Sequence, residues 1–363
     1  MLQSFWKDCL KSLSRLSSFP RLPMQVAFMA IALLTPAAAS AAPKDVAYIS
    51  VDVNTGKILS RYRETEKMHP ASLTKMMTLY ILFDVLDDNR ISLNTRLKVS
   101  KNAASKPASK LYVKSGSTIR VEDAIRALAI KSANDVATVV AENLAGSEAA
   151  FALSMTNTAR ALGMRNTTFK NASGLHHAQQ VTTAYDMYLL SVALQDRFPK
   201  YYKYFGESSF KYGSKSIRGH NPFLGSWRGV DGIKTGYTRA SGYNLATNIA
   251  RDRKHVVAVV LGSSSSKSRN NLMKDLLSKS IAKAKKGYRT SALRTDDIPT
   301  LIFQENTVAM LAQVDYTPKT LDITPDKRPK LFNHLPENFF YTDQDVLHMM
   351  VEHYDLRIAS QNQ

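Results

Sequence analysis

Ser72 and Lys75 have the residue types of a nucleophile and its base, and they stand three positions apart. Residues three apart on a helix lie on one face, so a helix that begins here would place the hydroxyl beside the amine. A lysine kept neutral by burial and by a second cation can take the serine proton. The N–H groups of a helix's first turn are unpaired, so that of Ser72 can donate to a developing oxyanion.

The spacing alone is weak evidence, because it also occurs at Ser208, Ser264 and Ser280. Ser72 differs in its context. It follows His69-Pro70-Ala71 and opens an apolar stretch, whereas the other three serines lie in polar or charged stretches. We therefore take Ser72 as the candidate nucleophile.

A second group, Ser132-Ala133-Asn134, falls at the joint between two stretches with helical patterns. A serine hydroxyl there can relay a proton, and the amide of Asn134 can hold a substrate carbonyl. The alternative is that Ser132 or Asn134 merely caps the next helix. The pattern alone leaves both interpretations open.

The third group, Lys234-Thr235-Gly236, begins a stretch with strand character. A lysine beside a threonine can bind a carboxylate by charge and by hydroxyl. The glycine leaves room for a substrate backbone along the strand edge. The alternative is a lysine on a solvated strand face followed by a turn glycine.

The first 42 residues have the order of a secretory signal: a basic segment, a short apolar run at 26–34, and small residues at 37–42. The apolar run is shorter than the roughly 20 residues that span a bilayer. We expect cleavage after Ala41 or Ala42 and an exported, periplasmic protein, with an uncleaved N-terminal anchor as the alternative. The basic residues are Lys7, Lys11, Arg15 and Arg21.

The composition is that of a globular protein, with 44% hydrophobic residues, and it excludes a disordered chain. The single cysteine, Cys9, excludes a disulfide scaffold and a thiolate metal cluster. The net charge is +19, from 49 basic and 30 acidic residues. Residues 43–287 alone carry 38 basic and 18 acidic residues, or +20. For an exported protein, we expect peripheral contact with an anionic wall or membrane face and no nucleic acid partner.

Strand patterns at both ends of the chain's central part enclose a helical middle, with no regular alternation of strand and helix. This predicts an α/β protein of the α+β type, with an antiparallel β-sheet flanked by helices and a mainly helical subregion. The expected strands are 46–53, 57–62, 230–237, 243–249 and 255–261. The expected helices are 73–85, 121–130, 133–144, 147–162, 183–195 and 267–285.

These patterns divide the chain into three parts: the signal peptide at 1–42, a catalytic domain at 43–287, and a C-terminal tail at 288–363. The tail has a net charge of −4, from seven basic and eleven acidic residues, and prolines interrupt it, among them Pro318, Pro325, Pro329 and Pro336. A helix is expected only at 346–358. Its few positive charges make it a poor membrane-surface helix, so a membrane anchor is not evident.

The three groups stand in the order Ser-x-x-Lys, Ser-x-Asn, Lys-Thr-Gly, with steps of 60 and 102 residues, an order typical of β-lactamases and penicillin-binding proteins. With the segments 47–57, 70–78, 166–187 and 230–245, the chain resembles the serine D-alanyl-D-alanine carboxypeptidases. These are the low-molecular-mass penicillin-binding proteins of the peptidase family S11 type. The resemblance covers about residues 44–285 and implies a fold like that of β-lactamases and transpeptidases.

The resemblance also implies a role for each site residue. Ser72 would form an acyl-enzyme at the bond between two D-alanines, with Lys75 as the base. Ser132 would bridge Lys75 and Lys234 as a proton relay, and Asn134 would hold the substrate amide. The backbone N–H groups of Ser72 and Tyr237 would form the oxyanion hole. The terminal carboxylate would be received by Lys234 and Thr235, with Gly236 beside them and Arg269 as a further candidate.

The implied partners are peptidoglycan stem peptides, with β-lactam antibiotics as covalent inhibitors, and no cofactor or metal is implied. D,D-endopeptidase and β-lactamase activities would use the same site, and an inactive peptidoglycan-binding or penicillin-sensing protein is a further alternative. A class A β-lactamase would need a Glu-x-x-Leu-Asn segment before Lys234, and none is convincing. We interpret the adjacent His176 and His177 as incidental, not as metal ligands. The tail resembles neither the second domain nor the anchor of this family.

Overall fold

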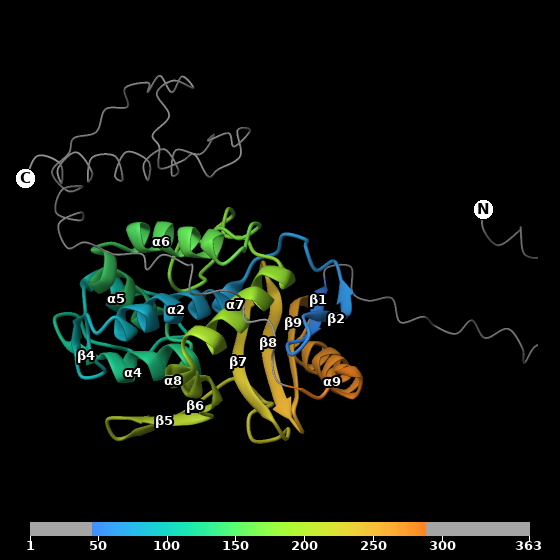
Figure 1. The fold of residues 1–363 in the computed structure, drawn as a ribbon. Coiled ribbons are helices and arrows are strands. Elements are labelled where there is room, and N and C mark those ends of the chain that lie inside the picture. The colour runs from blue at the N-terminus through green and yellow to red at the C-terminus, as the bar shows by residue number, and fades with distance from the viewer. Residues whose placement is uncertain (1–45, 288–363) are drawn as a thin grey trace, which may run out of the picture. The chain divides into compact units, whose positions relative to one another are not determined.

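The computed structural model describes residues 46–287, and its centre is a five-stranded antiparallel sheet (Figure 1). The strands lie in the order β2-β1-β9-β8-β7. The first strand pairs with the last, from Ala47 opposite Leu261 to Asp52 opposite Val256, so the two ends of the domain meet in the sheet. The strands are β1 (Ala47–Asp52), β2 (Lys57–Tyr62), β7 (Val230–Thr238), β8 (Gly242–Arg251) and β9 (Lys254–Ser263).

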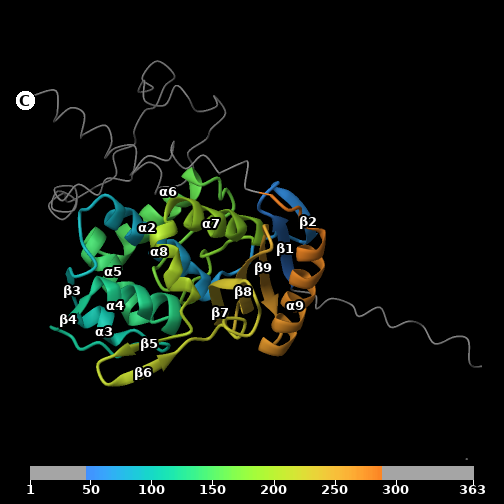
Figure 2. The same cartoon turned by 60° about the horizontal axis from the view of Figure 1, so that its bottom comes forward.

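Helices cover both faces of this sheet, as Figures 1 and 2 show. Because successive side chains of a strand point to opposite faces, β9 serves two cores at once. Val256, Ala258 and Val260 pack in one cluster with residues of α9 (Ser266–Lys283). Val259 and Leu261 belong to the larger core with the helical region. Because this central strand is buried on both faces, its residues form a continuous apolar run.

The helix that follows Ser72, α2 (Thr74–Asp87), lies inside the helical region and has twelve buried residues among its fourteen. Its apolar residues are spread around the axis, as expected for a helix that is covered on all sides. The predicted buried helix at 73–85 is therefore confirmed. Its position fixes the first catalytic candidates, because Lys75 belongs to its first turn.

Several of the remaining helices begin with a side-chain cap at the N-terminus. Ser147, Thr183 and Ser265 each accept a backbone N–H with their side chains at the start of α6, α7 and α9. The other helices are α3 (Lys101–Ser105), α4 (Val121–Arg126), α5 (Asn134–Ala145), α6 (Glu148–Ala161), α7 (Ala184–Arg197) and α8 (Pro199–Tyr202). A π-helical turn at Ala127–Lys131 follows α4, and 3₁₀ turns cover Ala71–Leu73 and Lys203–Gly206.

The structure confirms the predicted α+β fold with an antiparallel sheet. Two small two-stranded sheets were not predicted, because their strands are only three or four residues long and carry little periodicity. They are β3 (Arg96–Lys98) with β4 (Thr118–Arg120), and β5 (Ser209–Tyr212) with β6 (Lys215–Arg218).

The expected signal at 1–42, the tail at 288–363 and its helix at 346–358 lie outside the described residues. The division into three parts therefore stays a prediction. Within residues 46–287, no helix combines the length and apolar character needed to cross a membrane.

Candidate active site

Ser72 lies in a short 3₁₀ turn that leads directly into α2. The preceding residue, Ala71, has a φ of +47°, in the left-handed region that L-residues rarely adopt. Gly174 packs against this turn so closely that a Cβ there would lie 1.9 Å from the carbonyl oxygen of Ala71. The strained turn is thus held by a segment 103 residues away in sequence, and only glycine fits at the contact.

The side-chain nitrogen of Lys75 is fully buried and has three hydrogen-bond partners. They are the hydroxyl of Ser72 at 3.2 Å, Oδ1 of Asn134 at 2.7 Å, and the backbone carbonyl of Ser173. The predicted contact between serine and lysine is present. A neutral amine has two N–H groups and one lone pair. With Asn134 and Ser173 as acceptors, that lone pair would face the Ser72 hydroxyl.

Burial holds the pKa of Lys75 well below its usual range, and the positive charge of Lys234 lowers it further. The carboxylates of Asp135 and Glu148 act in the opposite direction. A neutral lysine next to a serine hydroxyl is the arrangement that a general base needs.

Ser132 ends the π-helical turn in a left-handed conformation, with φ at +61°, and its hydroxyl is buried. Among the described residues this hydroxyl has no hydrogen-bond partner, so it does not bridge Lys75 and Lys234 in this state. The amide of Asn134 accepts from Lys75 and donates to the carbonyl of Pro107 at 2.9 Å. Asn134 therefore lies in the centre of the site, while its contact with substrate and the relay through Ser132 stay predictions.

The edge strand β7 presents Lys234 to Tyr237 beside the serine turn. A Cβ on Gly236 would lie 3.0 Å from the backbone nitrogen of Ser72, so the glycine lets the strand approach the nucleophile. Tyr237, the next residue, is 54% exposed, and its ring packs on Tyr243. The two N–H groups proposed for an oxyanion hole thus belong to neighbouring segments.

Lys234 is buried, and its amine donates to its neighbour's carbonyl, Thr235 O, at 3.0 Å. Burial lowers the pKa of Lys234 to about 7, and the positive charge of Arg269 contributes. The Arg269 side chain is buried on the first turn of α9 and is bound to Asn270. The positive charge of Arg269 acts on Lys234, and its role in binding the carboxylate stays a prediction.

Two residues of the site were not singled out in the sequence. The buried Asn244 on β8 donates to the carbonyls of His69 and Pro70, both at 3.0 Å, and accepts from Gly262 N at 2.9 Å. It joins the segment before Ser72 to the sheet. A lone asparagine in a strand carries no signal for such a role, because its partner is 175 residues away in sequence.

We expect Asn244→Ala to lower the free energy of unfolding by about 2–5 kcal/mol, because it leaves buried carbonyl and N–H groups without partners. Urea denaturation of the purified protein measures this. The matched control is Asn271→Ala on α9, where the side chain is exposed and a change within about 0.5 kcal/mol is expected. Equal effects of the two substitutions would contradict the role given to Asn244.

The second such residue is His220, which lines a cleft together with Lys234 and Thr235. Burial lowers the pKa of His220, and the charges of Lys234 and Lys131 lower it further. Its imidazole is therefore neutral at neutral pH and adds a polar group, not a charge, beside the candidate carboxylate site. The cleft lies between Lys234 and Thr235 of β7 and the segments at 205–208 and 219–224.

Within residues 46–287, no group of three or more histidine, cysteine, aspartate or glutamate side chains is arranged to hold a metal. His176 is exposed, and its ring contacts that of His69, whose Nδ1 donates to the backbone carbonyl of Gln180 at 2.8 Å. This pair joins the loop at 170–181 to the serine turn.

The fold and the order of its motifs define the class of β-lactamase-like proteins that includes the penicillin-binding proteins. The family model for D-alanyl-D-alanine carboxypeptidase, Peptidase S11, matches residues 35–265. The chain belongs to this family.

Curated relatives agree. D-alanyl-D-alanine carboxypeptidase DacC of Escherichia coli is 35% identical over 238 residues, which are 64% of this chain and 60% of DacC. DacF of Bacillus subtilis is 32% identical over 61% of this chain and 58% of its own length. The chain thus spans about 60% of the length of these relatives. Penicillin-binding protein D2 of Listeria monocytogenes, solved in its cefotaxime-bound form, is 30% identical with a TM-score of 0.60, covering 64% of this chain and 95% of its own.

Proposed function

We propose that this protein is a serine D-alanyl-D-alanine carboxypeptidase that removes the terminal D-alanine from peptidoglycan stem peptides. The observation that carries the proposal is the contact of the fully buried Lys75 amine with the Ser72 hydroxyl at 3.2 Å. Family membership and the Lys-Thr-Gly strand beside this pair support it. An exported, periplasmic location follows from the signal-like first 42 residues and belongs to the same proposal.

In acylation, the Ser72 oxygen attacks the carbonyl carbon between the two D-alanines while its proton passes to neutral Lys75. The carbonyl oxygen becomes an oxyanion, which the N–H groups of Ser72 and Tyr237 stabilise. Collapse of the tetrahedral intermediate breaks the C–N bond. The proton then passes from Lys75 to the leaving amine of D-alanine, through the buried hydroxyl of Ser132 in our proposal. An ester on Ser72 remains.

In deacylation, water attacks this ester, and Lys75 again takes and returns the proton, which regenerates the Ser72 hydroxyl and frees a shortened stem peptide. No other reactant is needed for the balance. Specificity for a free C-terminal carboxylate would come from Lys234 and Thr235, which line one cleft, and from Arg269, whose positive charge acts on Lys234.

β-Lactams are expected to acylate the same serine, as the cefotaxime-bound relative supports. Lys75 bonds to a backbone carbonyl of the 170–181 loop, Ser173 O, and not to a carboxylate. The loop therefore supplies Lys75 with no glutamate of the kind that activates deacylating water in class A β-lactamases. We expect an inhibitor complex that hydrolyses slowly.

The test is D-alanine release by the purified protein from a monomeric pentapeptide, run beside a cross-linked peptide dimer and a labelled penicillin. Release from the pentapeptide with stable penicillin labelling is expected. Cleavage of the dimer alone would show that the protein is an endopeptidase instead. Rapid penicillin turnover without D-alanine release would show that it is a β-lactamase. Labelling without any hydrolysis would indicate a penicillin-sensing protein.

The dependence of kcat/KM on pH should be bell-shaped, because two lysines must hold opposite protonation states. As pH falls through the lowered pKa of Lys75, the base gains a proton and the rate falls. As pH rises through about 7, Lys234 loses the charge that attracts the carboxylate, and the rate falls again. Lys234→Arg stays charged, so it should remove the alkaline limb. An unchanged alkaline limb in that variant would contradict the assignment.

A further inference from the structure

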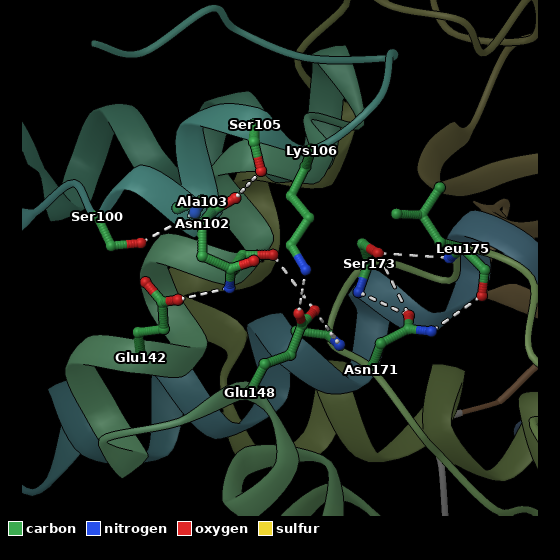
Figure 3. A network of polar contacts seen from close by, with 12 residues as sticks. Ser100, Asn102, Ala103, Ser105, Lys106, Glu142, Glu148, Asn171, Ser173 and Leu175 are labelled. Atoms are coloured by element: carbon green, nitrogen blue, oxygen red, sulfur yellow. Dashed lines mark hydrogen bonds and ion pairs between the residues drawn. The ribbon is translucent and has the colours of Figure 1, made fainter. Parts of the chain in front are cut away.

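An ion pair outside the catalytic motifs joins two segments that flank them. Nζ of Lys106, just after α3, lies 2.7 Å from Oε2 of Glu148 in the first turn of α6. Figure 3 shows the two side chains pointing toward each other beside the loop that carries Ser173. Their side chains are only 20% and 14% exposed, so this pair is better shielded than a surface ion pair.

On one side, Glu148 holds the segment 171–175. Its Oε1 accepts the backbone N–H of Ala172 at 3.2 Å and the hydroxyl of Thr138 at 3.2 Å. The backbone carbonyl of the next residue, Ser173, accepts a hydrogen bond from Lys75, and Gly174 packs on the turn before Ser72. A shift of this segment would therefore move both an acceptor of the base and a support of the nucleophile.

On the other side, Lys106 begins the segment 106–113. The carbonyl of Pro107 accepts from the Asn134 side chain at 2.9 Å, and the carbonyl of Ser109 accepts from the Asn134 backbone at 2.7 Å. The ion pair therefore joins the two segments that supply acceptors to Lys75 and Asn134. These segments are about 65 residues apart in sequence.

We propose that Lys106 and Glu148 form a positioning pair, which holds these two segments together and keeps the charge of Glu148 from acting in full on Lys75. The proposal rests on the proposed carboxypeptidase function. The charged groups that face Lys75 are Asp135 from α5, Glu148 from α6 and Lys234 from β7. Of these, Glu148 has a cationic partner, Lys106, that can be removed without changing the catalytic motifs.

The two single substitutions should move the acid limb of the pH profile in opposite directions. Lys106→Met leaves the Glu148 carboxylate uncompensated, which raises the pKa of Lys75 and moves the limb to higher pH. Glu148→Gln removes the carboxylate but keeps an acceptor for Ala172 N, so the limb moves to lower pH. With both substitutions, the limb should return close to that of the wild type. Lys106→Arg keeps the positive charge, so its acid limb should lie at the same pH as that of the wild type.

The experiment measures the second-order rate of acylation by a labelled penicillin from about pH 4 to about pH 9, which includes the range of about pH 5 to 8 where protein stability tends to be highest. We expect Lys106→Met to slow acylation about tenfold at the pH optimum through misplaced acceptors. The matched control is Lys279→Met, which breaks an exposed ion pair of the same 2.7 Å length on α9 and should change neither the rate nor the limb.

Opposite limb shifts with the double variant near the wild type would support the proposal. Slower acylation by Lys106→Met with an unshifted acid limb would overturn the proposal in favour of a purely structural bridge. Acylation rates of Lys106→Met equal to those of Lys279→Met would overturn it as well, because the ion pair would then have no effect on the site. If Lys106→Met does not fold, the acid limb of Glu148→Gln and Lys106→Arg is measured instead. It should move to lower pH in Glu148→Gln and stay in place in Lys106→Arg. Absence of acylation in the wild type would instead overturn the proposed function, so the two failures are distinguishable.

Discussion

Ser72→Ala is expected to abolish both D-alanine release and penicillin labelling, with a loss of about 10⁴-fold or more in acylation rate. The serine oxygen is the atom that forms the bond to the substrate, and within residues 46–287 no other hydroxyl is hydrogen-bonded to Lys75. The fold should survive, because alanine is smaller than serine and the turn is held in the core by its neighbours Ala71 and Leu73, which are buried. Labelling with a fluorescent penicillin, followed by gel analysis, measures the loss.

The chain supplies a matched control for this substitution. Ser264 also stands three residues before a lysine, but it is exposed and lies at the end of the sheet, before α9. Ser264→Ala should therefore keep full labelling and full D-alanine release. Labelling that survives in Ser72→Ala, or that disappears in Ser264→Ala, would show that the nucleophile has been assigned to the wrong serine.

Lys75→Arg is expected to slow acylation by about 10³-fold, within the range typical for a lost general base. Arginine keeps the positive charge but does not deprotonate in proteins, so it cannot take the proton of Ser72. Its larger head also has to fit a buried site whose three acceptors surround a single nitrogen. The acylation rate and the thermal unfolding temperature should be measured together.

A comparison with Lys75→Met distinguishes two roles of Lys75, that of a neutral general base and that of a fixed positive charge. If the lysine acts through its neutral form, arginine and methionine should be about equally inactive. If it acts only by its positive charge, arginine should keep most of the rate. High activity in Lys75→Arg would contradict the neutral base and, with it, the acid limb of the predicted pH profile.

The sequence predicted the parts of this site that are local. A serine and a lysine three apart on a helix meet wherever that helix forms, and the strand with Lys234 follows from its own pattern and that of its hairpin partner. The sheet could also be predicted, because the hairpin at 46–62 and the last strands show clear apolar runs. These features depend on neighbours within a few residues.

The contacts that hold the site together could not be predicted, because they join segments far apart in sequence. Gly174 against Ala71 is a contact across 103 residues, and Asn244 reaches His69 across 175. A glycine or an asparagine in a loop or strand has the same local pattern with or without such a partner. The ion pair of Lys106 with Glu148 was hidden for the same reason, since each residue alone resembles an ordinary surface charge.

Mass spectrometry of the protein after reaction with a β-lactam tests the central claim most directly. We expect one adduct per chain, with the mass of the intact opened antibiotic, on the peptide that contains Ser72 and on no other. The adduct should be absent from Ser72→Ala and present in Ser264→Ala. An adduct on a different residue, or D-alanine release without any adduct on Ser72, would contradict a mechanism in which Ser72 is the nucleophile and Lys75 its base.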